Sequence, residues 1–454
     1  MTTLEARPAM PAWMVGVAVF VYLSGWALIR PPLQSPDEPQ HLMKANSVWL
    51  QPWLNAVPDH FMPDRSRVNP LAWQTPPALD SLFFQPLNAL ASADVGVMRT
   101  TPWLPPQGPP LASYQRAIAT YPQVYYWGVY LLSEPIIRGA GLTPWDATFV
   151  YRLATCAMVA VLWALVWVAC RRAAIPSDVA GTLLAFVLIT PMLAFISSAV
   201  NPDAVNDALC ALVIVAAWEV LSRGTGATAC AIALLAAALT KPSGLQLAAV
   251  LAVVAVGLGA AGLVDRRRAA VVVGIAAGMV VVAFAVFYAW QPLRFLATGP
   301  SNDTFGQYLE QRWIMLPDMW RTYWGKLGWL DYNASTGWYV LMLVLLLVNI
   351  ACLIWRPRRP THLTWYLGTL WILFMLSTFA AELRYLSEAG YTFQGRYLLP
   401  AALGLGAVLL HEVRAARMAM VAGLVALNVV LADATVHRYY GGGWQGAVHA
   451  LPFR

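Results

Sequence analysis

The chain has 454 residues, of which 59% are hydrophobic and only 11% are charged, whereas about 25% of the residues of a soluble domain are charged. This composition excludes a soluble globular protein and a disordered one. The apolar residues come in blocks of about 20, which also disfavours a β-barrel, because apolar and polar residues alternate along barrel strands. The net charge of +7 is ordinary for a membrane protein with basic cytoplasmic loops and gives no reason to expect a nucleic-acid partner. The sequence predicts one integral membrane domain over residues 1–454, an all-α polytopic transmembrane bundle embedded in the lipid bilayer.

About eleven apolar segments are long enough to cross a bilayer. They cover residues 11–30, 147–170, 177–198, 204–221, 225–240, 243–263, 269–290, 337–355, 362–381, 397–411 and 418–433. With the N-terminus inside and the C-terminus outside, the basic clusters beside the short loops all fall on the cytoplasmic side, as the positive-inside rule requires.

The segment 121–138 is also apolar, but a span there would move Arg171 and Arg172 to the outside. Its tyrosines and tryptophan suit a headgroup environment, so we expect a helix lying at the outer interface. The outer side then carries a first loop, 31–146, with interfacial helices, and a second loop, 291–336. The cytoplasmic side has only short turns, which predicts a protein that works at its outer face.

The first outer loop opens with Ser35-Pro36-Asp37-Glu38-Pro39-Gln40-His41. One interpretation is structural: Ser35 and Glu38 form a capping box, with Pro36 at the first helical position. The other is chemical: Asp37 or Glu38 is a general base near the membrane surface, with His41 one turn further along the same face. If the capping box occupies Glu38, Asp37 is the free carboxylate, and His41 orients it.

Two further motifs begin helices at the same outer face. Asn201-Pro202-Asp203 is typical of a helix start, and the polar residues Asn206 and Asp207 that follow suit either a cavity or hydrogen-bonded packing. Lys241 precedes Pro242 where the next outer turn ends, so its charge adds to the positive end of a helix dipole. It is either an anion site or a lysine that reaches lipid headgroups.

The remaining motifs are aromatic and basic. In Trp324-Gly325-Lys326-Leu327-Gly328-Trp329, Trp324 and Trp329 suit either stacking on a sugar or an interfacial aromatic belt. In Gln394-Gly395-Arg396-Tyr397, Arg396 is either a bidentate phosphate ligand or an interfacial anchor. Carboxylates and cations on one face are what an enzyme needs to hold a lipid phosphate near a general base.

As an ordered series, these motifs resemble the GT-C superfamily of polytopic glycosyltransferases, and more closely a bacterial membrane family of unknown function that is thought to be GT-C-like. The series runs from Pro36 to Tyr397 and covers most of the chain. The resemblance implies a GT-C-like architecture in a bacterial inner membrane with a periplasmic active face. It also implies transfer of a sugar from a polyprenyl-phosphate donor to a glycan, lipid or protein acceptor.

The resemblance assigns the catalytic role to Asp37, with Glu38 and His41 beside it, and donor phosphate binding to Lys241, Arg396 and Lys326. It leaves Asn201, Asp203, Trp324, Trp329, Gln394 and Tyr397 to line the cavity. Some GT-C enzymes use a divalent metal, so metal dependence stays open. Two alternatives stay open as well: a transporter or flippase of a lipid-linked glycan, and a non-catalytic partner in envelope polysaccharide assembly.

Overall fold

The computed structural model describes residues 10–35, 37–46, 48, 121–287, 305–328, 330, 332–356, 362–382, 394–440, 443–449 and 451–452. Most of the predicted first outer loop, residues 49–120, and the first part of the second, residues 291–304, lie outside the described residues, as does Trp329.

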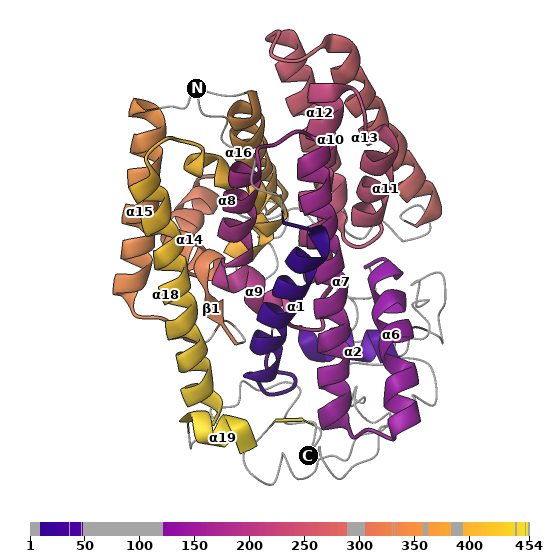
Figure 1. Ribbon diagram of the computed structural model, residues 1–454, viewed down its shortest axis with the longest axis vertical. Coiled ribbons are helices and arrows are strands. Elements are labelled where there is room, and N and C mark those ends of the chain that lie inside the picture. Colours follow the sequence, from indigo (N-terminus) through magenta and orange to yellow (C-terminus); the bar gives the residue numbers. More distant parts are fainter. Residues whose placement is uncertain are drawn as a thin grey trace, which may run out of the picture.

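The described chain is a bundle of helices (Figure 1). The first part contains α1 (Ala12–Leu28), α2 (Glu38–Asn46), α6 (Val124–Ala140), α7 (Pro144–Arg172), α8 (Ser177–Leu188), α9 (Pro191–Ser197), α10 (Pro202–Arg223), α11 (Ala227–Ala238), α12 (Pro242–Ala260) and α13 (Arg266–Val286). The second part contains α14 (Phe305–Trp324), β1 (Lys326–Leu327), β2 (Tyr332–Asn333), α15 (Thr336–Trp355), α16 (His362–Glu382), the 3-10 helix η5 (Gly395–Ala401), α17 (Ala402–Leu405), the 3-10 helix η6 (Gly406–Leu409), α18 (Arg414–Tyr439) and α19 (Gly443–His449).

Within the described residues, seven helices are long and apolar enough to cross a membrane, or eight if the bent pair α8 and α9 is one span. Helices α1 and α11 and the segment 395–409 are apolar but shorter. Each of the eleven predicted segments coincides with a helical element, so the all-α membrane fold class is confirmed. The number of spans and their sidedness stay predictions.

Two predicted spans are irregular. Helices α8 and α9 meet at 72°, because Pro191 begins α9 and disfavours helical geometry at the preceding residue, and Thr190 is indeed extended. The segment around 397–411 consists of 3-10 turns around the short α17, since Pro400 lacks the amide N–H that an α-helix would use.

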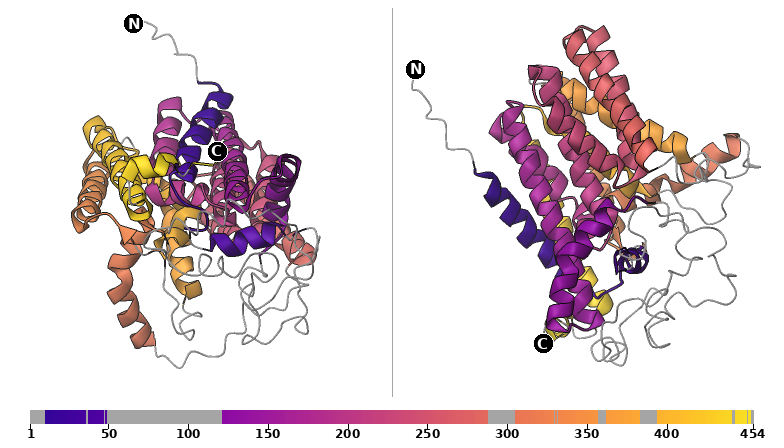
Figure 2. Two further views of the ribbon diagram at one scale, coloured as in Figure 1. Left: turned by 90° about the horizontal axis from the view of Figure 1, so that it is seen from below. Right: turned by 90° about the vertical axis from the view of Figure 1, so that its right-hand side faces the viewer.

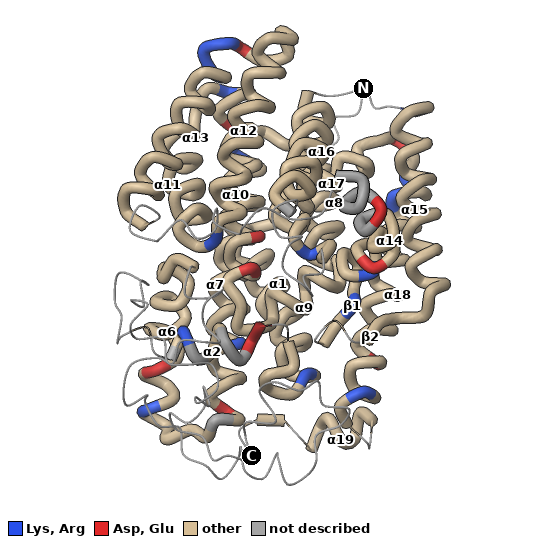
Figure 3. Tube along the Cα trace, turned by 180° about the vertical axis from the view of Figure 1, so that it is seen from behind, with Lys and Arg blue, Asp and Glu red and all other residues tan. Residues whose placement is uncertain are grey.

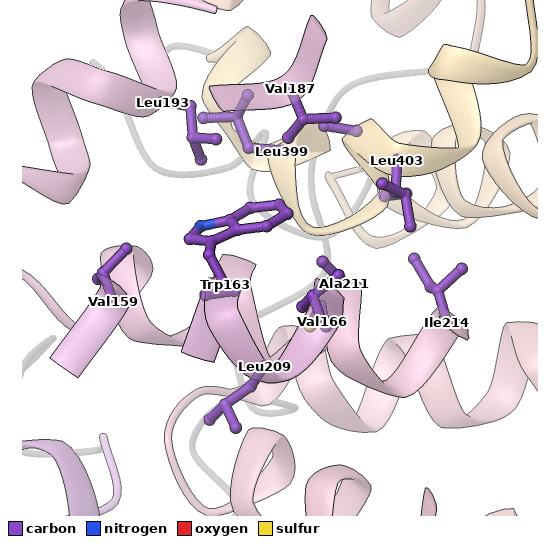
Figure 4. Close-up of a cluster of buried hydrophobic side chains, with 14 of the residues drawn as sticks. Val159, Trp163, Val166, Val187, Leu193, Leu209, Ala211, Ile214, Leu399 and Leu403 are labelled. Carbon is purple, nitrogen blue, oxygen red and sulfur yellow. The ribbon is translucent and has the colours of Figure 1, made fainter. Parts of the chain in front are cut away.

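Helix α10 is the centre of the bundle and packs against α7, α11 and α13, and 94% of its apolar window is buried. Trp163 of α7 fills the space between this helix and its neighbours (Figure 4). The indole is 1% exposed and lies among Leu193, Leu399, Ala211 and other apolar side chains. The neighbouring helices therefore pack around α10.

The two ends of α10 differ in character. At its C-terminal end, Arg172 pairs with Glu219 at 3.1 Å, and Arg268 donates to the Ser222 carbonyl. Basic residues also mark the turn that begins α13 (Figure 3). Asn201 caps the opposite end of α10, so the basic clusters and the predicted site residues of this helix are separated by its whole length.

Helix α2 lies crosswise to the long helices (Figures 1 and 2) and packs against α6. The predicted helix at 121–138 is α6, which also packs against α7 and buries Tyr125 and Tyr126. The predicted second outer loop contains the helix α14 and an antiparallel two-stranded hairpin that pairs Lys326 with Asn333, which are structures the sequence did not indicate.

Candidate functional site

A cavity of about 200 Å³ opens at the N-terminal end of α10, far larger than the ~10–15 Å³ that one water molecule needs. It lies where α10, α12, α16 and η5 meet. Its walls are Tyr121, Asp203, Asn206, Asp207, Lys241, Pro242, Ser243, Gln246, Thr378, Ala381, Arg396, Tyr397 and Pro400. Six of the residues singled out from sequence therefore line one cavity: Asp203, Asn206, Asp207, Lys241, Arg396 and Tyr397.

Asp203 and Lys241 form an ion pair across the ends of two helices. The Asn201 side chain accepts the Asp203 amide N–H at 2.9 Å, and Pro202 begins α10, so the predicted helix start is confirmed. Asn201 caps the helix and is not in the cavity wall. Lys241 is the N-cap of α12, and its ammonium binds the Asp203 carboxylate. Burial lowers the pKa of Lys241, but Asp203 outweighs burial, so the pKa lies above its ordinary value.

Arg396 brings the cavity into contact with the first outer loop. Its Nη2 donates to Oδ2 of Asp37 at 3.0 Å. The Arg396 side chain is 5% exposed, whereas that of Asp37 is 44% exposed. Among the described residues, nothing accepts a hydrogen bond from Nε or Nη1 of Arg396. Two buried nitrogen atoms of this guanidinium are thus available to donate hydrogen bonds to an anion in the cavity.

The backbone around these two residues is unusual. Asp37 has φ 61°, a left-handed conformation that Asp tolerates better than most residues. Gly395 lies so close to α14 that an added Cβ would be 2.2 Å from the Met319 carbonyl oxygen. The Gly395 N–H donates to the Thr322 hydroxyl at 2.7 Å. The glycine of the Gln394-Gly395-Arg396-Tyr397 motif therefore sets how near Arg396 comes to the bundle.

The two cations of the cavity wall are close to each other. Lys241 Nζ is 5.8 Å and Arg396 Cζ is 5.6 Å from the centroid of the Tyr397 ring. They are therefore separated by no more than the sum of these distances, which is within reach of one phosphate and two long side chains. The Lys241 ammonium is also 5.4 Å from the centroid of the Tyr121 ring.

Glu38 has a different partner from the one predicted. The capping box is wrong, because the Ser35 hydroxyl has no partner among the described residues. Instead, the Glu38 carboxylate accepts two hydrogen bonds from Arg152 of α7, at 2.7 and 2.6 Å, and one from the Val200 amide. Burial raises the pKa of Glu38, but Arg152 outweighs it and holds the pKa below its ordinary value. Glu38 thus joins α2 to α7.

His41 is buried and forms a hydrogen bond with the Tyr126 hydroxyl, 2.7 Å from its Nδ1. Its ring also stacks on Tyr121 at 6.0 Å between centroids. Burial lowers the pKa of His41 to about 3. The predicted contact with Asp37 is thus replaced by contacts with α6 and with Tyr121, which lines the cavity.

The described residues of the tryptophan motif, which exclude Trp329, do not line the cavity. Trp324 is fully buried at the end of α14, with Phe186 and Tyr323 against its ring. Lys326 pairs with Asp318 at 2.6 Å. Gln394 precedes η5 but is absent from the cavity wall. Among the described residues, no group of three or more His, Cys, Asp or Glu side chains is arranged to hold a metal ion.

Sequence reasoning missed Arg152, Gln246 and Thr378. Arg152 lies 114 residues from Glu38, so no local pattern connects them. A charged residue within a long apolar segment was the available signal. Gln246 of α12 donates to the Thr378 hydroxyl of α16 at 2.7 Å, which joins two walls of the cavity.

Comparison with protein families decides where the chain belongs. The model of the family described as predicted membrane protein (DUF2142) matches residues 20–405. The chain is a member of this family. The match spans nearly the same residues as the motif series, so the expected resemblance to a bacterial membrane family of unknown function is confirmed.

Two solved structures resemble this DUF2142 protein, both of ArnT from Cupriavidus metallidurans. The form bound to undecaprenyl phosphate has 14% identity and a TM-score of 0.43, over 96% of this chain and 62% of that one. The apo form has 16% identity and a TM-score of 0.38, over 94% of this chain and 78% of that one. The chain thus spans 62% of the length of the lipid-bound ArnT chain. No curated protein matches the chain.

Proposed function

We propose that this DUF2142 protein is a glycosyltransferase. It would move a sugar from a polyprenyl-phosphate donor to an acceptor at the outer, periplasmic face of a bacterial inner membrane. The observation that carries the proposal is the position of Arg396. It lines the cavity together with Lys241 and donates a hydrogen bond to Asp37. One guanidinium therefore contacts both the proposed anion site and the carboxylate proposed as the base.

The donor phosphate would bind between Lys241 and Arg396. The amide N–H groups at the start of α12 and its dipole favour an anion beside Lys241. Arg396 offers Nε and Nη1, which have no partner among the described residues. Asp203 pairs with Lys241 and Asp37 pairs with Arg396, so burying these two cations does not leave isolated charges.

The reaction breaks the bond between the anomeric carbon and the phosphate oxygen and forms one between that carbon and an acceptor hydroxyl oxygen. The hydroxyl proton passes to Asp37, and the bonding electron pair leaves with the polyprenyl phosphate. Lys241 and Arg396 stabilise the charge that develops on this phosphate. Asp37 supplies the general base, a role worth roughly 10²–10⁴-fold in rate.

Asp37 suits this role better than its neighbour. Its carboxylate is partly exposed and accepts a hydrogen bond from Arg396, which lines the cavity. Glu38 is fully buried and bound by Arg152 and Val200, so its oxygens cannot reach an acceptor without breaking α2 away from α7. Glu38 therefore supports the structure of the site.

A direct test measures binding of undecaprenyl phosphate to the purified protein in detergent. Lys241→Ala and Arg396→Ala should each weaken binding by about 1.5–3 kcal/mol, the usual worth of a charge-assisted hydrogen bond, or roughly 10–150-fold in Kd. Arg396→Lys should also weaken it, because Lys lacks the planar fork. Arg267→Ala, which removes an exposed cation at the start of α13, is the matched control. Equal binding by all four variants would end the proposal.

A further inference from the structure

The inner part of the cavity differs from its mouth in the kind of polar atom it offers. Asn206 and Asp207 of α10 are buried, 0% and 4% exposed, and both line the cavity. Neither Oδ1 of Asn206 nor Oδ2 of Asp207 has a hydrogen-bond partner among the described residues. Unsatisfied buried oxygens are rare in folded proteins and costly unless a ligand or water binds them.

Gln246 adds a third oxygen to this wall. Its Nε2 donates to the Phe374 carbonyl and to the hydroxyls of Ser377 and Thr378, at 3.3, 2.8 and 2.7 Å. The carbonyl can only accept, so these contacts fix the orientation of the amide. The amide nitrogen is fully used, which leaves Oε1 as the Gln246 atom that can accept a hydrogen bond from a ligand.

The cavity is therefore divided by chemistry. Lys241 and Arg396 offer only N–H donors, whereas Asn206, Asp207 and Gln246 offer oxygens. Asp207 is four residues beyond Asp203 on α10, so it lies about 6 Å deeper along the helix axis, on the same face. Because an ionised phosphate only accepts hydrogen bonds, these oxygens suit it less well than the N–H donors of Lys241 and Arg396 do. A ligand that fits both parts has an anionic end and, beside it, an end that carries hydroxyl groups.

We propose that Asn206, Asp207 and Gln246 form a subsite for the hydroxyl groups of the donor sugar, beside the phosphate site. This inference rests on the function proposed above and extends it from the carrier phosphate to the sugar. A hydroxyl both donates and accepts, so it pairs with the Asp207 carboxyl group in either protonation state. In this arrangement the sugar ring lies deeper in the bundle than the phosphate.

The test compares binding of undecaprenyl phosphate with binding of undecaprenyl-phosphoryl lipids that carry a hexose, a pentose or an N-acetylhexosamine. The intact protein should bind at least one sugar-bearing lipid about tenfold or more tightly than the bare carrier. Asp207→Asn and Gln246→Met should each reduce that preference at least threefold and leave the Kd of the bare carrier within about twofold. Lys241→Ala should weaken binding of both lipids.

Three outcomes would overturn the subsite. The intact protein could show no preference for any sugar-bearing lipid, or both variants could keep the wild-type preference. Both variants could also lose affinity for the bare carrier and the sugar-bearing lipid by the same factor. A melting curve for each variant identifies one that fails to fold, and the other then decides. Failure of the proposed function looks different. In that case the intact protein binds neither the bare carrier nor a sugar-bearing lipid, whatever happens at Asp207.

Discussion

The guanidinium of Arg396 and the carboxylate of Asp37 are 3.0 Å apart, although 359 positions separate them in the sequence. The contact joins the start of η5 to the residue before α2. Arg396 also lines the cavity that contains Lys241, so one side chain contacts both the proposed base and the proposed phosphate site. Movement of η5 or of the chain before α2 would therefore change the proposed base and the proposed phosphate site together.

The buried pair of Glu38 and Arg152 is predicted to maintain the site without taking part in chemistry. Glu38→Gln leaves Arg152 uncompensated at 0% exposure, and breaking such a pair costs about 3–5 kcal/mol. Thermal unfolding in detergent should show a clear loss of stability. Glu38→Gln with Arg152→Met should recover part of that loss, since neither charge is then buried alone. A Glu38→Gln protein as stable as wild type, yet inactive, would instead indicate a catalytic Glu38.

Gly395→Ala should weaken binding of undecaprenyl phosphate, because the new methyl group would lie 2.2 Å from the Met319 carbonyl oxygen and must displace η5 from α14. Arg396, the next residue, would move with it. Gly368→Ala in α16 is the matched control, since an added Cβ there meets nothing within 4 Å. Equal binding by the two variants would contradict this account of how Arg396 is positioned.

His41 should make the protein sensitive to acid. Its pKa in the folded state is about 3, whereas an unfolded His has a pKa of ~6.5. Between these values the unfolded state binds a proton that the folded state does not. The free energy of unfolding should therefore fall as pH decreases, by up to about 1.4 kcal/mol per pH unit.

The comparison that isolates this effect is wild type against His41→Asn, with unfolding measured at pH 7 and pH 5. The other titrating groups are the same in both proteins, so the variant should lose less stability between the two pH values. An identical loss would mean that His41 titrates as an exposed residue and is not held neutral against Tyr126.

Local patterns allowed the helix starts to be predicted. Asn201 and Pro202 act within one turn of α10, and Lys241 and Pro242 do the same at α12. Asp203 and Lys241 meet in one cavity, as expected from the predicted position of both helix starts on one face. The partners were not predictable. Lys241 was expected to bind an anion or to reach lipid headgroups, but Asp203, 38 residues earlier, binds it, and no local spacing encodes that pairing.

In the second outer loop, the helix itself was not predicted. Residues 291–336 were predicted as a loop, so α14 was missed together with the contacts it makes. Trp324 seemed suited to a sugar or to the aromatic belt, but it ends this helix in the core. Lys326 seemed suited to the donor phosphate, but Asp318 of α14 binds it. Helix α14 has an interior proline, Pro317, and a mixed polar and aromatic composition, so it offers no apolar block of the kind that marks the spans.

The account depends most on Asp37 as the base. The most direct measurement is the initial rate at which a bound sugar-bearing lipid releases undecaprenyl phosphate in proteoliposomes that also contain bacterial membrane extract as the acceptor source. Mass spectrometry of the released carrier detects transfer to any acceptor. Asp37→Asn keeps an oxygen that can accept from Arg396. It should therefore leave the Kd of the donor within about twofold but lower the rate by about 10²–10⁴-fold. An Asp37→Asn protein that releases the carrier at the wild-type rate would contradict the central claim.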